Sequence, residues 1–194
     1  MTKTFLPPQF LSNKVAYTNQ YVTVNETSLV LMRQDDQTKL IENLYKDYYT
    51  AECQDFVVGI VIKENKILTI NQYRVPIRKF NTEFVAGTIE VGETATEAIH
   101  KELLEEAGIK AHDVKCLGKF HPLSGFNSTI GYLYLITDFE EVPRKLEEYE
   151  EFTNLTVSWI TIDEFRARLQ SNEIVDGVTL TSWALFREII EVMP

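Results

Sequence analysis

The hydrophobic pattern in the middle of the chain alternates between apolar runs and short polar breaks. Residues 56–62 (FVVGIVI) and 66–74 (KILTINQYR) are separated by Glu64 and Asn65, which is typical of a hairpin whose first strand is buried. Further strand-like runs are found at residues 114–120, 130–136 and 155–160. The pattern therefore predicts a sheet built from several strands.

The first part of the chain also carries strand-like runs. Residues 21–24 (YVTV) and 28–32 (SLVLM) are separated by the polar residues 25–27, which we interpret as a turn. Residues 38–50 fit either a strand or a short helix, and their periodicity does not decide between the two.

One segment after the predicted hairpin has clear helical signals at both ends. Thr94 followed three residues later by Glu97 is a capping box, and Gly108 suits the left-handed residue that ends a helix. Ile99 and Leu103 lie four residues apart, so they share one apolar side of this helix. We expect that side to pack into a core.

Two more helices are expected near the end of the chain. Thr161 and Glu164 form a second capping box, and apolar residues recur at near-helical spacing over residues 179–192. Strands interleaved with a few helices predict an α/β fold in which a mixed sheet lies between helices, an α/β/α sandwich. We assign this domain to residues 51–194 and expect residues 1–50 to form a small N-terminal β extension.

Four acidic residues in and before the first helix have the spacing that a metal site needs. Glu102, Glu105 and Glu106 lie on one helical face, and Glu93 precedes them. Carboxylates so close together repel each other, and a hard cation such as Mg²⁺ or Mn²⁺ relieves that repulsion. The alternative is that these acids are only solvated surface residues, which is common for isolated Glu pairs on helices.

Residues 87–109 resemble the Nudix box, a pattern of Gly, Glu, Arg-Glu, Glu-Glu and Gly at fixed spacings. The matching positions are Gly87, Glu93, Glu102, Leu103, Glu105, Glu106, Gly108 and Ile109. The one departure is Lys101, where the family has Arg. Lysine keeps the charge and can pair with Glu105 or Glu97 one turn away, but it cannot make the two-pronged contact of a guanidinium.

Segments on both sides of the box resemble the ADP-ribose pyrophosphatase branch of the Nudix hydrolases. Residues 72–76 (QYRVP) match a strand end of that branch, and residues 83–87 (EFVAG) match its Glu-x-Pro-Ala-Gly motif, with Val85 in place of proline. Residues 173–180 resemble its final loop and helix start. Residues 123–125 (LSG) replace a Ser-Pro-Gly turn, so we expect a different loop shape near the terminal sugar.

The resemblance implies hydrolysis of the pyrophosphate bond of a nucleoside diphosphate sugar. ADP-ribose, cleaved to AMP and ribose 5-phosphate, is the substrate that the branch suggests first. Another nucleoside diphosphate sugar or a dinucleotide is an alternative within the same chemistry. A Nudix domain that senses a nucleotide sugar without cleaving it is an alternative of another class, and the intact Glu102, Glu105 and Glu106 argue against it.

The resemblance also implies a metal site. Mg²⁺, or Mn²⁺ in its place, is expected at Glu102, Glu105, Glu106 and the backbone carbonyl of Ala86. Such ions neutralise the charge of a diphosphate and acidify the attacking water.

Substrate contacts and a general base are implied outside the box. Arg74, Glu83 and Gly125 are the expected substrate-binding residues, although Arg74 fits a plain salt bridge at a strand end equally well. In the branch the base comes from an acidic loop ahead of a Trp-bearing strand. The candidates here are Glu148, Glu150 and Glu151.

The branch also suggests a homodimer in which the N-terminal strands of one subunit complete the site of the other. Tyr17, Tyr21 or a nearby aromatic residue would then stack on adenine, while ordinary packing between strands is the alternative.

Composition limits the other classes of function. With 19 Lys and Arg against 29 Asp and Glu, the net charge is −10, which disfavours nucleic acid as a partner. Cys53 and Cys116 lack metal-ligand spacing and are expected to be reduced thiols. The chain has no apolar run long enough to span a bilayer and no apolar signal-peptide core near its start, so we expect a cytoplasmic protein without a membrane partner.

Overall fold

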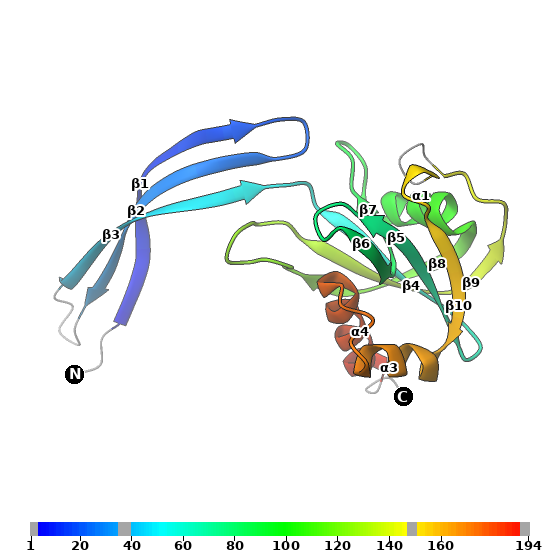
Figure 1. Ribbon diagram of the computed structural model, residues 1–194. Coiled ribbons are helices and arrows are strands. Elements are labelled where there is room, and N and C mark those ends of the chain that lie inside the picture. Colours follow the sequence, from blue (N-terminus) through cyan, green and yellow to red (C-terminus); the bar gives the residue numbers. More distant parts are fainter. Residues whose placement is uncertain (1–3, 35–39, 147–150, 191–194) are drawn as a thin grey trace. The chain divides into compact units, whose positions relative to one another are not determined.

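The computed structural model describes residues 4–34, 40–146 and 151–190 (Figure 1). Contacts within the chain divide it into two compact units. The first comprises Met1–Gln54 and Leu123–Thr129, and the second comprises Asp55–Pro122 and Ile130–Pro194. The segment Leu123–Thr129 follows the Nudix-like box in sequence but is grouped with the N-terminal residues. The predicted division of the chain, a single boundary after residue 50, did not include such a segment.

The first unit is built on a three-stranded antiparallel sheet in the order β1-β2-β3. Its strands are β1 (Thr4–Thr18), β2 (Thr23–Gln34) and β3 (Leu40–Glu52). The segment Leu123–Thr129 attaches to the end of β3, where the Ala51 N–H donates to the Phe126 carbonyl at 2.9 Å. The segment 38–50, ambiguous in sequence, is therefore a strand from Leu40 onward.

The turn predicted at residues 25–27 is wrong, because β2 continues through it. Asn25 is buried, and its side-chain amide donates to Glu52 Oε1 at 2.7 Å. Thr27 likewise donates to Asn13 Oδ1 of β1 at 2.7 Å. Polar residues in this strand are satisfied by neighbouring strands, so their polarity did not mark a turn. The turn lies earlier, where Asn19 Oδ1 accepts from the backbone of residues 21 and 22 at 2.8 and 2.9 Å.

The second unit contains a seven-stranded mixed sheet. Its main path is β10-β5-β4-β9-β8, with β6 paired to β5 and β7 paired to β4. The β4 and β9 strands are parallel and the other pairs are antiparallel, which confirms the predicted mixed sheet. The strands are β4 (Phe56–Lys63), β5 (Lys66–Arg74), β6 (Lys79–Glu83), β7 (Val85–Thr88), β8 (Ile109–Phe120), β9 (Gly131–Glu141) and β10 (Thr156–Thr161).

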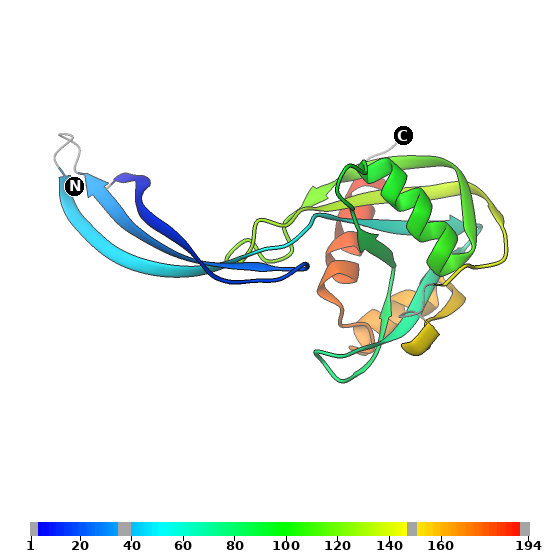
Figure 2. The same cartoon turned by 90° about the horizontal axis from the view of Figure 1, so that it is seen from above.

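Three helices cover the two faces of this sheet. Helix α1 (Ala95–Ala107) lies on one face, and α3 (Ile162–Gln170) and α4 (Gly177–Ile190) lie on the other (Figures 1 and 2). Side chains alternate along β4, so Val57 packs in the cluster under α1 while Val58 packs in the cluster under α3 and α4. The expected α/β/α sandwich is confirmed.

Helix α1 begins and ends as its sequence predicted. The Thr94 hydroxyl accepts from the Glu97 N–H at 3.2 Å, and Glu97 Oε2 accepts from the Thr94 N–H at 2.9 Å. Gly108 has a φ of 64°, and its N–H caps the last turn. Strand β8 starts at the next residue, so the backbone reverses at Gly108 and brings the strand back beside the helix.

Other boundaries differ from those expected. Strand β8 begins at Ile109 instead of residue 114, and β9 continues to Glu141 instead of ending at residue 136. Helix α4 begins at Gly177, two residues before the expected residue 179, and its expected last residue, Val192, lies outside the described residues. The short strands β6 and β7 were not predicted. Among the described residues, no helix is long and apolar enough to cross a membrane.

Replacing Gly108 by alanine is expected to lower the free energy of unfolding by about 2 kcal/mol or more, because the positive φ disfavours a side chain and the new methyl group would collide with the Val142 carbonyl oxygen. Gly92→Ala is the matched control, since Gly92 also has a positive φ but has open space around it. Urea unfolding of both variants measures the difference. Equal losses at the two positions would contradict the collision with Val142.

Candidate functional site

The acidic face of α1 packs against the backbone of β7. Glu102 and Glu106 are 9% and 4% exposed, whereas Glu105 is half-buried. Glu106 Oε2 accepts a hydrogen bond from the Ala86 N–H at 3.2 Å. A methyl group added at Gly87 would overlap the Glu102 carboxylate, so only glycine leaves room for that side chain. Two of the three predicted acids therefore converge on adjacent residues of one strand.

Lys101 contacts three acids at the start of this face. Its Nζ lies 2.8 Å from Glu90 Oε1, 3.5 Å from Glu93 Oε2 and 3.9 Å from Glu102 Oε1. Burial disfavours its charge, but the hydrogen bond to Glu90 and the nearby acidic charges outweigh that effect, so the pKa of Lys101 is raised. The hydrogen bond to Lys101 lowers the pKa of Glu90 in turn.

The contacts of Lys101 in the described part of the chain include Glu90, Glu93 and Glu102, and its predicted pairing with Glu97 is wrong. Glu97 instead accepts from the backbone and hydroxyl of Thr94, which keeps it at the start of the helix. The residues between β7 and α1 fold back over the helix, and Glu93 Oε2 also accepts from the Glu90 N–H at 3.0 Å. Partners from this loop are not visible in helical spacing alone, which is why the sequence suggested neighbours on α1.

The donor atoms on this face suit a hard divalent cation. Carboxylate oxygens are the ligands that Mg²⁺ and Mn²⁺ prefer, and buried carboxylates at i and i+4 can share one ion. Within residues 4–34, 40–146 and 151–190, however, no three His, Cys, Asp or Glu side chains are gathered closely enough to form a metal site by themselves. Glu105 as a third ligand, and the Ala86 carbonyl as a fourth, therefore remain predictions.

Arg74 and Glu83 form a two-pronged ion pair on neighbouring strands. Arg74 Nε and Nη2 donate to Glu83 Oε1 and Oε2 at 2.9 and 2.5 Å. Asn81 Nδ2 also donates to Glu83 Oε1, at 3.1 Å. The hydrogen bond to Glu83 raises the pKa of Arg74 despite its partial burial, and the charges of Glu106 and Asp176 act in the same direction. The salt bridge considered for Arg74 is present, and three of its five N–H donors take no part in it.

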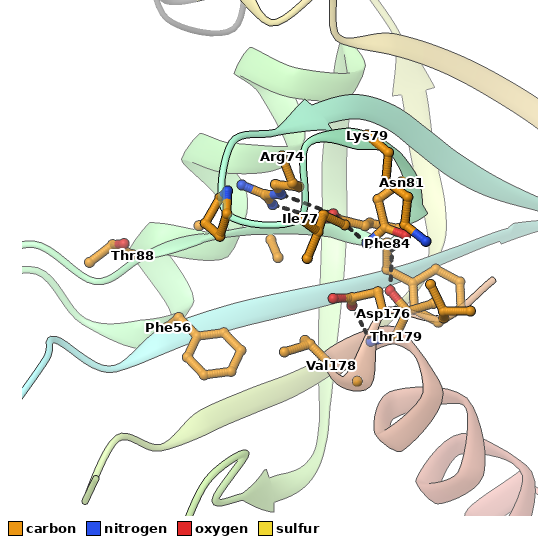
Figure 3. A pocket seen from close by; sticks show the side chains of 16 residues that line it. Phe56, Arg74, Ile77, Lys79, Asn81, Phe84, Thr88, Asp176, Val178 and Thr179 are labelled. Atoms are coloured by element: carbon orange, nitrogen blue, oxygen red, sulfur yellow. Dashed lines mark hydrogen bonds and ion pairs between the residues drawn. The ribbon is translucent and has the colours of Figure 1, made fainter. Parts of the chain in front are cut away.

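A cavity of about 630 Å³ opens beside this ion pair (Figure 3). Its walls come from β4, the β5–β6 turn, β6, β7 and the first turn of α4. The polar residues on its walls include Arg74, Lys79, Asn81, Glu83 and Asp176, and the apolar ones include Phe56, Ile77 and Val178. Ala86 and Gly87 belong to the same wall, so the backbone that Glu102 and Glu106 contact also borders the cavity.

Comparison with known proteins adds a family to this geometry. The model of the NUDIX domain matches residues 54–178, which is more than half of the chain. The chain belongs to the Nudix family. The resemblance expected from residues 87–109 is thereby confirmed.

Proteins similar in sequence to this Nudix chain include an enzyme activator and a pyrophosphatase. It is 32% identical to a methanol dehydrogenase activator of Bacillus methanolicus over 122 residues, which cover 62% of this chain and 64% of that protein. It is 28% identical to an ADP-ribose pyrophosphatase of Bacillus subtilis (strain 168) over 119 residues, covering 61% and 64%. The chain therefore spans less than two thirds of the length of these two relatives.

A solved structure supports the Nudix fold over nearly the whole chain. The crystal structure of an ADP compounds hydrolase superposes with a TM-score of 0.79 at 19% sequence identity, covering 98% of this chain and 97% of that one. At this level of identity the agreement concerns the fold.

The remaining predicted site residues of this Nudix chain come from two other segments. Glu151 is exposed, next to the start of β10, and Glu148 and Glu150 lie outside the described residues. Gly125 belongs to the segment Leu123–Thr129, which the structure groups with the N-terminal sheet. The assignments of Gly125 to substrate and of a glutamate in this loop to the base stay predictions.

Asp176 and Asn81 are among the polar residues of the cavity that sequence reasoning missed. Asp176 accepts from the Thr179 N–H at 2.7 Å and caps α4, and an Asp just ahead of an apolar periodic segment is a signal that could have found it. Asn81 lies two residues before Glu83 on β6, so the two side chains share one face of the strand, and Asn81 is 5% exposed. Nothing in its local sequence marks it, because β6 itself was not predicted.

We expect Gly87→Ala to displace the Glu102 carboxylate and to weaken Mn²⁺ binding by about tenfold or more, because the added methyl group takes the space of a proposed ligand. Calorimetric titration with Mn²⁺ measures the change. Gly177→Ala serves as the control, since it also adds a methyl group but meets open space. Unchanged Mn²⁺ affinity in a folded Gly87→Ala protein would remove Glu102 from the metal site.

Proposed function

We propose that this protein hydrolyses the pyrophosphate bond of a nucleoside diphosphate sugar with the help of a divalent cation, Mg²⁺ or Mn²⁺. ADP-ribose, giving AMP and ribose 5-phosphate, is the substrate we favour, because the relative of Bacillus subtilis is an ADP-ribose pyrophosphatase. The observation that carries the proposal is the pair of buried carboxylates, Glu102 and Glu106, on the backbone of a strand that also borders the cavity.

The proposed cation site is formed by acidic residues of α1 and by the lysine that contacts them. Glu102 and Glu106 would hold the cation, which supplies charge neutralisation for the diphosphate and acidifies the attacking water. Lys101 orients Glu102 and Glu93 by contacting both, as the arginine of the family pattern would. Its single ammonium group attracts them as a point charge, without the fixed fork of a guanidinium.

Arg74 is the proposed anchor for the anionic part of the substrate. Two hydrogen bonds to Glu83 hold its guanidinium in one orientation, and Asn81 donates a third to Glu83 itself. The N–H groups of Arg74 that remain can donate to phosphate oxygens. A side chain fixed before the substrate arrives loses less conformational freedom on binding. Glu83, expected to contact substrate, would then act chiefly by positioning Arg74.

The candidates for the general base are acidic residues of the segment just ahead of β10. Glu151 is exposed, and the Asn154 N–H donates to its backbone carbonyl at 3.1 Å, so its backbone lies in a turn just ahead of β10. We propose that Glu148, Glu150 or Glu151 takes the proton of the attacking water. A carboxylate on such a loop can approach the diphosphate when substrate binds.

The activity test compares Glu106→Gln with the wild type in the presence of Mg²⁺. The variant keeps an oxygen that can accept from the Ala86 N–H, so we expect a folded protein whose kcat is lower by about a thousandfold or more, because an amide cannot balance the charge of the cation. Mononucleotide release from ADP-ribose, ADP-glucose, a GDP sugar and a dinucleotide is measured by chromatography.

The control is Glu97→Gln, which lies on the same helix but can keep its capping contact with Thr94. Activity of Glu106→Gln within about tenfold of wild type would exclude Glu106 from the site. Tight binding of a nucleotide sugar without any mononucleotide release by the wild type would favour the sensor over the hydrolase.

We also propose that the protein is a homodimer assembled through the sheet β1–β3. Several large apolar side chains of this sheet are exposed to solvent in a single chain, among them Phe10 at 69%, Tyr17 at 56% and Tyr49 at 57%. Apolar surface on three strands is typical of an interface, and three strands alone bury too little to be stable without a partner. Tyr17 and Tyr21 are then available to stack on the base of the substrate.

Light scattering should report about twice the 22.4 kDa mass of one chain at micromolar concentration. The variant Phe10→Glu places a charge on the exposed sheet and should shift the protein toward the monomer mass. A wild type that is monomeric and fully active under the same conditions would contradict the dimer.

A further inference from the structure

Asp176 presents one carboxylate oxygen to the cavity while the other holds the start of α4. Its Oδ2 accepts from the Thr179 N–H at 2.7 Å, and the Thr179 hydroxyl accepts from the Phe84 N–H at 3.2 Å. The first turn of α4 is thereby tied to the backbone that links β6 to β7. Figure 3 shows the Asp176 side chain directed toward the open space between Phe56 and Ile77. Its position is therefore fixed before any ligand binds.

The cavity holds two acceptors that have no hydrogen-bond partner among the described residues. A carboxylate only accepts hydrogen bonds, and Oδ1 of Asp176 receives none from the part of the chain that the structure describes. Asn81 lines the same cavity, is 5% exposed, and its Oδ1 has no hydrogen-bond partner among the described residues. A buried acceptor without a partner is costly, so a ligand that supplies hydrogen-bond donors gains more here than one that does not.

Two features indicate the chemistry of the ligand: the negative charge of Asp176, and the position of the cavity beside the strand that contacts the acids of α1. A phosphate group would be repelled by the Asp176 carboxylate, whereas hydroxyl groups can donate to it. The cavity borders Ala86 and Gly87, which contact Glu106 and Glu102, so a group bound here would lie next to a diphosphate held at those acids. That favours a sugar over a base, because the base of a nucleotide is separated from the diphosphate by its ribose.

We propose that Asp176 is a specificity-determining residue that accepts hydrogen bonds from the hydroxyl groups of the terminal sugar. This assignment rests on the proposed hydrolysis of a nucleoside diphosphate sugar. A carboxylate that binds sugar hydroxyls selects against analogues lacking them, since the acceptor is then left unpaired in the complex. The apolar residues Phe56, Ile77 and Val178 supply the walls that exclude water around that contact.

The test uses substrates that differ by single hydroxyl groups. ADP-ribose is compared with two analogues, each lacking one hydroxyl of the terminal ribose, on wild type, Asp176→Ser and Asp176→Asn. Serine and asparagine are as good as aspartate at capping a helix, so both variants should melt close to the wild type. Serine withdraws the acceptor from the cavity, and asparagine can keep the cap while turning its NH₂ group to the ligand.

We expect the wild type to prefer ADP-ribose over at least one analogue by about 10- to 100-fold in kcat/KM, the range of one hydrogen bond to a charged group. In both variants that preference should fall to within about threefold, through a lower kcat/KM for ADP-ribose and a nearly constant value for the analogue. A preference that persists in both folded variants would overturn the assignment. A change confined to the preference between ADP-ribose and GDP-ribose would place Asp176 at the base and would also overturn it.

Failure of the proposed hydrolysis is recognised separately, because the wild type would then release no mononucleotide from any of these compounds. In that case calorimetric titration with ADP-ribose and its two analogues replaces the kinetic measurement. Affinity that depends on the hydroxyl in the wild type and not in Asp176→Ser supports the role of Asp176. Equal affinities for all three compounds, or no binding to the wild type, would contradict it.

Discussion

The close approach of α1 to β4 and β7 is the constraint on which the site depends. Gly59 of β4 has no side chain, and a methyl group there would lie 3.0 Å from Ile99 Cδ1. Gly87 of β7 likewise leaves the space that the Glu102 carboxylate occupies. One glycine thus admits the apolar side of the helix and the other admits its acidic side. The carboxylates of Glu102 and Glu106 reach the backbone of β7 because the helix can lie this close to the sheet.

Two cations organise the acids around this contact. Arg74 is held by Glu83 and feels the charges of Glu106 and Asp176, while Lys101 contacts Glu90, Glu93 and Glu102. Lys101 is shared among three carboxylates, so its side chain is restrained from more than one direction, whereas two hydrogen bonds to Glu83 restrain Arg74. A chain with a net charge of −10 can therefore keep an acid-rich region ordered around few positive groups.

Local patterns were sufficient for α1 and for the first hairpin of the second unit. The capping box of Thr94 and Glu97, and the positive φ of Gly108, depend on residues close together in sequence, so the sequence predicts them well. The polar residues 25–27 show the opposite case. Asn25 is satisfied by Glu52, far along the chain, and no local pattern distinguishes such a residue from one in a turn. The short strands β6 and β7 escaped prediction because only pairing with β5 and β4 defines them.

By itself the sequence determined the family, the fold class and the acids of α1, because the spacing of a helix places Glu102, Glu105 and Glu106 on one face whatever surrounds them. Only the tertiary structure decided which of these acids meet β7, which acids Lys101 contacts, and that Asp176 reaches the cavity bordered by Arg74. Those contacts join segments that are distant in sequence. Their partners are chosen by strand register and by how closely the layers pack, and neither quantity is recorded in a local pattern.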